Sequence, residues 1–94
     1  MQRVDERPCY SMAMVPSNPT LSDLVQRAHA HALNAAAAKL KADSFAASAD
    51  DYDHWGLEHE AASRRGSARE LRVAALIEDA RADALADELA RRAV

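Results

Sequence analysis

Residues 20–47 read TLSDLVQRAHAHALNAAAAKLKADSFAA, and this alanine-rich stretch decides the fold class. It holds no Gly or Pro, the residues that most often interrupt a helix, and alanine is the best helix former. Its apolar residues share one face at helical spacing: Leu21, Leu24, Val25, Ala28, Ala32, Ala35 and Ala36. The stretch therefore predicts a long helix that begins either after Asn18–Pro19 or at a capping box formed by Thr20 and Asp23.

The rest of the chain divides around this helix. All three Pro precede residue 20, so we expect an N-terminal extension at residues 1–18 and a helical domain at residues 19–94. In the extension, Tyr10, Met12 and Met14 alternate with smaller residues, which is typical of a short strand. Such a strand would need a partner strand from a second copy, and the alternative is a tail packed on the helices.

Two further helix starts are indicated downstream. Ser48 followed by Asp51 has the spacing of a helix N-terminus, and Arg65–Gly66 has the composition of a helix end. Ser67–Glu70 reads as a second capping box. The expected helices cover about residues 19–47, 49–64 and 67–92. We therefore predict an all-α fold, a small antiparallel three-helix bundle or helical hairpin with an N-terminal extended segment.

The last predicted helix is apolar on two sides. One stripe contains Val73, Leu76, Ile77, Ala80 and Ala84, and a roughly opposite stripe contains Leu71, Ala75, Ala82, Leu85 and Leu89. A helix that is apolar on two sides must bury both or leave one exposed. An alanine-rich core also buries little apolar area. Both features predict a homo-oligomer, with a dimer as the expected form.

Residues 51–60, DYDHWGLEHE, concentrate acids, histidines and aromatics. If the stretch is one helix, its spacing places Tyr52, Trp55 and His59 on one face and Asp51, His54 and Glu58 on another. The first set is a candidate aromatic anchor for a partner, because Trp and Tyr dominate binding hot spots, although they also fill small cores. The second set is interpreted as a solvated acidic face.

The alternative interpretation of that acidic face is a metal-binding site. Asp51 and His54, or His54 and Glu58, have the spacing of two ligands on one helix. A di-iron type of site would need a second copy of the chain and bridging acids from the last helix, at Asp79, Asp83 or Asp87. His29 and His31 lie too far apart around the first helix to share an ion and are expected at the edge of the core. We expect no metal and no other cofactor.

Catalytic motifs are not found. Cys9 is the single cysteine, so neither an intrachain disulfide nor a cysteine zinc cluster can form. Two glycines cannot build a phosphate-binding loop, and no nucleophile motif occurs. We therefore expect a non-enzyme. The charged N-terminus and the absence of a long apolar run predict a cytoplasmic protein without a membrane span.

The densest basic cluster comprises Arg64, Arg65, Arg69 and Arg72. Within it, residues 66–72, GSARELR, resemble the start of the second helix in ribbon-helix-helix antitoxins, a resemblance that implies a dimeric DNA-binding regulator. This chain has a far longer segment between the candidate strand and that helix than the family has. The net charge of −3 also argues against a generally basic nucleic-acid binder. The arginines are alternatively solvated or paired with Asp and Glu.

Taken together, these patterns predict a small bacterial or phage adaptor that binds itself or another protein of unstated identity through apolar helix faces. Its candidate partner-binding residues are Tyr52, Trp55, His59, Leu71, Leu85 and Leu89. The alternative function is a dimeric DNA-binding regulator or antitoxin that uses the arginine cluster from Arg64 to Arg72.

Overall fold

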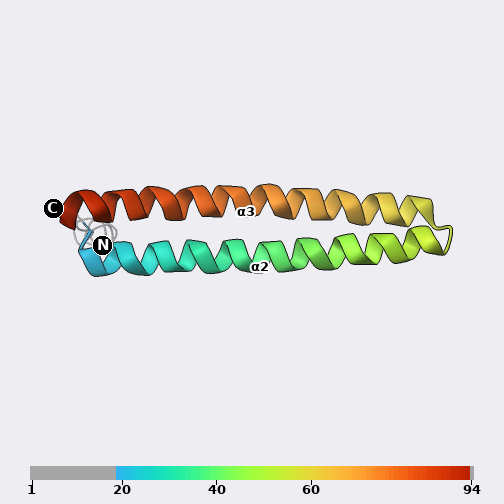
Figure 1. Ribbon diagram of the computed structural model, residues 1–94, viewed down its shortest axis with the longest axis horizontal. Helices are drawn as coiled ribbons and strands as arrows, with labels where there is room; N and C mark the ends of the chain where they lie inside the picture. Colours follow the sequence, from blue (N-terminus) through green and yellow to red (C-terminus); the bar gives the residue numbers. More distant parts are fainter. Residues whose placement is uncertain (1–18, 94) are drawn as a thin grey trace, which may run out of the picture.

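Two long helices joined by a short turn make up the described part of the chain, residues 19–93 of a computed structural model (Figure 1). Helix α2 spans Leu21–His54 and helix α3 spans Glu58–Ala93. They run antiparallel side by side over their whole length, and the turn lies at the far end from the start of α2 and the end of α3 (Figure 1). The all-α prediction in its helical-hairpin form is confirmed. The predicted strand at Tyr10–Met14 and the rest of residues 1–18 lie outside the described residues.

The N-terminus of α2 uses one of the two predicted caps. The Thr20 hydroxyl accepts a hydrogen bond from the Asp23 backbone N–H at 3.1 Å, and the Asp23 carboxylate accepts one from the Thr20 backbone N–H at 3.3 Å. This reciprocal capping box satisfies two backbone donors that the first helical turn leaves unpaired. The helix therefore begins at Leu21, two residues later than a start at Pro19 would give.

The seam between the helices follows an unbroken seven-residue repeat. In each helix every buried side chain lies on a set of positions that alternate at spacings of three and four residues, which is the pattern of a coiled coil. In α2 this seam contains Leu24, Ala28, His31, Ala35, Ala38, Ala42, Phe45, Ala49 and Tyr52. In α3 it contains Ala61, Arg64, Ala68, Leu71, Ala75, Glu78, Ala82, Leu85 and Leu89.

Alanine at every second seam position, which is every seventh residue, is what lets the two helices pack closely. Ala42, Ala49 and Ala61 are fully buried, with 0% exposure each. The antiparallel register, fixed by a contact between His31 and Glu78, brings the buried alanines of α2 about level with those of α3. Because a methyl group is the largest side chain in these layers, the core is thin, as the composition indicated.

The prediction of three helices was wrong in its internal boundaries. Residues 48–51, expected to start a new helix, lie inside α2, and Gly66 and the Ser67–Glu70 pattern lie inside α3. Local capping signals were overridden there because the heptad seam continues through both positions, and tertiary packing outweighs intrinsic preference. Ser48 and Ser67 are both half-buried beside the seam rather than free at a helix start.

The true break lies at Trp55–Leu57, within the stretch DYDHWGLEHE. Gly56 has a φ of +80°, a left-handed conformation that glycine adopts without steric cost. The Leu57 N–H donates to the Tyr52 carbonyl at 2.8 Å, and the Gly56 N–H donates to the Asp53 carbonyl at 3.0 Å. These two bonds form a Schellman motif, which closes the last turn of α2. Helix α3 follows at once, because the Ala61 N–H already donates to the Leu57 carbonyl.

Candidate interaction surfaces

The aromatic residues of the turn do not share one helix face, because α2 ends between them. Tyr52 is half-buried at the end of the seam, whereas Trp55 is 64% exposed at the tip of the hairpin. His59 lies on the far side of the turn, in the first turn of α3, and is exposed. The expected stripe of Tyr52, Trp55 and His59 is therefore replaced by a tip from which Trp55 protrudes.

Trp55 is held in place by neighbouring rings and charges. Its ring packs edge-on against Tyr52, with centroids 5.6 Å apart and planes at 82°. Arg64 of α3 lies over the Tyr52 ring, 4.5 Å from its centroid, and its Nη2 donates to the Tyr52 hydroxyl at 3.2 Å. Edge-to-face and cation–π geometries are both favourable. The tip thus presents an exposed indole on a support tied to both helices.

The acidic residues of the turn are likewise divided between the two helices. Asp51 and His54 lie in the last turn of α2, Glu58 lies at the start of α3, and all three are exposed. In residues 19–93 no three His, Cys, Asp or Glu side chains gather closely enough to hold a metal ion. Asp79, one of the acids considered as a bridging ligand, instead contacts Lys39 of α2 at 3.0 Å.

The arginine cluster is largely engaged by the hairpin itself. Arg65 contacts Asp50 at 2.9 Å and Asp53 at 2.6 Å, and Arg72 lies 3.4 Å from Asp43. Arg64 holds Tyr52. Arg69 is exposed on the outer side of α3. These contacts match the interpretation of the cluster as arginines paired with acids, and they cross-link α2 and α3 near the tip.

The two apolar stripes of the last predicted helix have different surroundings. Leu71, Leu85 and Leu89 are half-buried in the seam against α2, where the fold uses them. The opposite stripe faces outward: Val73 is 55% exposed, Leu76 68% and Ile77 48%. The free apolar side of α3 is therefore not the one whose leucines the sequence singled out as partner-binding.

Helix α2 carries exposed leucines at the same position along the hairpin axis as these α3 residues. Leu33 and Leu40 are 57% and 72% exposed and lie seven residues apart on its outer face. In the antiparallel register, residues 33–40 of α2 run alongside residues 70–77 of α3. We call the five side chains Leu33, Leu40, Val73, Leu76 and Ile77 the central apolar belt. Beside Leu76, where α2 and α3 meet on one side of the hairpin, lies a shallow open groove of about 380 Å³, lined by Lys39, Arg72, Ala75 and Leu76.

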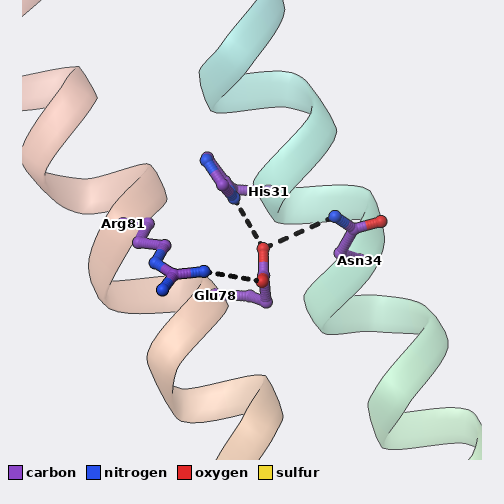
Figure 2. A network of polar contacts seen from close by, with 4 residues as sticks. All are labelled: His31, Asn34, Glu78 and Arg81. Atoms are coloured by element: carbon purple, nitrogen blue, oxygen red, sulfur yellow. Dashed lines mark hydrogen bonds and ion pairs between the residues drawn. The ribbon is translucent and has the colours of Figure 1, made fainter.

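A polar layer interrupts the seam close to this belt (Figure 2). The Glu78 carboxylate of α3 lies 2.6 Å from His31 Nδ1, and it accepts hydrogen bonds from Asn34 at 3.5 Å and Arg81 at 3.3 Å. The hydrogen bond from His31, followed by that from Asn34 and the nearby positive charges, holds the pKa of Glu78 below its usual range. His31 thus lies in the seam, as the edge-of-core prediction expected, whereas His29 is exposed.

This layer predicts a pH dependence of stability. A carboxylate whose pKa is lower in the folded state stabilises the fold at neutral pH, and that contribution is lost as the pH falls from about 4.3, the unfolded value, through the folded pKa. We therefore expect the urea midpoint to fall on acidification, and Glu78→Gln to flatten part of that fall. Glu88, whose pKa is lowered by Arg92 and Arg91, accounts for a remaining part.

Urea titrations followed by circular dichroism between about pH 6 and pH 3 measure this effect. Glu70→Gln, at an exposed position of α3, is the matched control and should leave the acid profile as it is in the wild type. If the urea midpoints of the wild type and the Glu78→Gln variant fell equally on acidification, the assignment of this pH dependence to Glu78 would be contradicted.

The fold and its surfaces define a class: an alanine-seamed antiparallel coiled-coil hairpin with a central apolar belt and an exposed tryptophan at its tip. Neither helix of the described part has an apolar stretch long enough to cross a membrane. Comparison of this chain with protein-family models, curated proteins and solved structures finds no match.

Proposed function

We propose that this chain is a small non-enzymatic interaction module that self-associates through the central apolar belt. The observation that carries the proposal is the group of three large aliphatic side chains in the α3 half of the belt, Val73, Leu76 and Ile77, each about half exposed or more and spaced three and four residues apart on the outer side of α3. Contiguous exposed apolar patches on small proteins mark interaction sites more often than isolated exposed residues do. A second hairpin packed against this side of α3 would bury all three side chains.

The thin seam supplies the physical reason for association. A short chain buries a smaller share of its surface than a large domain, and alanine layers add little apolar area. Pairing two hairpins through the outer sides of α3 would bury Leu76 with its neighbours Val73 and Ile77, which supplies large side chains that the seam lacks. A four-helix arrangement of two hairpins is the form that these faces favour.

Leu76→Glu tests the belt directly. Leu76 is the most exposed belt residue of α3, and a glutamate there would have to bury an unpaired carboxylate in the interface. We expect self-association to weaken by about thirtyfold, the loss of a hot-spot contact. Sedimentation velocity and light scattering over a concentration series measure it.

Ala62→Glu is the matched control, because Ala62 is exposed on the same helix but lies outside the belt. It should associate as the wild type does. A wild-type chain that remains monomeric across the whole concentration range would overturn the proposal.

DNA binding is less well supported as a function. Arg64, Arg65 and Arg72 already contact Tyr52 or carboxylates of α2, so their charge is partly neutralised within the hairpin. Nucleic-acid affinity depends on releasing counterions with uncompensated Lys and Arg. Strong, salt-sensitive retention on heparin that is lost in Arg65→Ala with Arg69→Ala would revive this alternative.

A further inference from the structure

The hairpin tip carries a second surface, distinct from the central apolar belt. Trp55 is 64% exposed and Leu57 beside it is 44% exposed, although both are large apolar residues. The turn that carries them has a fixed conformation, with two backbone hydrogen bonds closing the last turn of α2. An anchor that is already ordered loses little conformational entropy on binding.

The charge around the tip is predominantly negative. Residues 50–60 contain five carboxylates and no lysine or arginine. Arg65 reaches back to contact Asp50 and Asp53, and within residues 19–93 no ion pair is formed by the other three, Asp51, Glu58 and Glu60. The exposed indole therefore lies on a tip that carries five carboxylates against two arginines, Arg64 and Arg65.

The combination of an exposed indole and nearby carboxylates favours some binding partners over others. An anionic membrane surface or a nucleic acid would be repelled by the carboxylates, despite the affinity of tryptophan for interfaces and bases. A second copy of the tip would bring the same acids together. An apolar surface bordered by lysine or arginine would instead gain both contacts, the indole in its apolar part and the carboxylates at its rim.

We propose that the tip docks a basic amphipathic helix of another protein, with Trp55 and Leu57 against its apolar face and Asp51, Glu58 and Glu60 against its lysines or arginines. Helix recognition by an apolar site with acidic borders requires apolar anchors at helical spacing and a cationic flank on the ligand. The site does not involve the belt, so it would function whether or not the hairpin self-associates.

Trp55 is the only tryptophan and reports its own burial. The probe is a synthetic helical peptide with leucine at i, i+3, i+4 and i+7 and lysine elsewhere. Two comparison peptides replace lysine with glutamate, or leucine with serine. We expect only the leucine–lysine peptide to shift the Trp55 emission to the blue and to saturate the signal.

Variants assign the contact to the tip. We expect Trp55→Ala to weaken binding of the labelled leucine–lysine peptide, followed by anisotropy, by about thirtyfold. Asp51→Asn with Glu58→Gln should weaken it and reduce its dependence on salt. Leu76→Glu should bind the peptide as the wild type does, and Trp55→Ala should self-associate as the wild type does, which separates this site from the belt. Unchanged circular dichroism confirms that each variant is folded.

Other outcomes overturn the proposal. No emission shift with the leucine–lysine peptide, or an equal shift with the leucine–glutamate peptide, would remove the basic helix as the occupant. A comparable blue shift with vesicles of phosphatidylcholine and phosphatidylserine, and no peptide present, would assign the tip to a membrane surface instead. Peptide binding that survives Trp55→Ala undiminished would place the contact elsewhere on the hairpin.

Discussion

Ala42→Leu is expected to destabilise the hairpin by about 1–3 kcal/mol, because the leucine side chain has no space in the seam. Ala42 is 0% exposed, and the register brings it about level with the buried Ala68 of α3. Accommodating the larger side chain requires the two helices to move apart, which loosens the neighbouring alanine layers as well. A 2 kcal/mol loss corresponds to a fall in melting temperature of about 8–16 °C for a domain of this size.

Thermal and urea denaturation followed by circular dichroism measure this loss. Ala47→Leu is the matched control, since Ala47 is an exposed residue of the same helix and leucine is almost as good a helix former as alanine. Its stability should lie within about 0.5 kcal/mol of the wild type. Equal stability of both variants would mean that the helices are not packed through their alanines.

The two glycines are expected to respond in opposite directions to the same substitution. Gly56→Ala should destabilise the hairpin by about 1–2 kcal/mol, because its φ of +80° is unfavourable for any residue with a Cβ. No atom lies within 4 Å of the position that a Cβ would occupy, so the cost comes from the backbone alone. Gly66→Ala should stabilise by about 0.5–1 kcal/mol, because Gly66 lies inside α3.

Space at Gly66 supports that sign. The nearest atom to an added Cβ is the Arg69 Nη2 at 3.8 Å, an ordinary contact with the end of a flexible side chain. Urea denaturation of the two variants under the same conditions provides the comparison. If Gly66→Ala destabilised the hairpin and Gly56→Ala did not, the helix break would lie at residue 66, where the sequence pattern had placed it.

The misplaced prediction of a helix break at residue 66 shows how far local sequence signals define helix ends. Arg65–Gly66 followed by Ser67–Glu70 has the composition of a helix end and a new helix start. Trp55–Gly56, by contrast, is followed directly by no residue that commonly caps a helix N-terminus. The signal that identifies the true break is the seven-residue repeat of alanine. Alanine recurs every seven residues from Ala28 to Ala49 and again from Ala61 to Ala82, and this repeat passes through residue 66 but changes phase across the turn.

The all-helical class and the thin core followed from composition and spacing, and the Thr20 capping box was one of the two helix starts that the sequence offered. The choice of the free α3 stripe did not, because both stripes are apolar and only the position of α2 decides between them. Leu71 and Leu85 face the seam for that reason, and Val73 and Leu76 face outward. The contact of His31 with Glu78 was equally inaccessible, since it joins residues whose proximity depends on where the chain turns.

The seven-residue alanine repeat also makes the hairpin a spacer of adjustable length. Helix α2 has 34 residues and α3 has 36, so the tip lies about 50 Å from the Pro19 end at 1.5 Å per residue. Adding or removing one heptad in each helix would preserve the alanine layers and move Trp55 by about 10 Å along the axis. The distance from the tip to the Pro19 end of the hairpin is thus set in steps of one repeat.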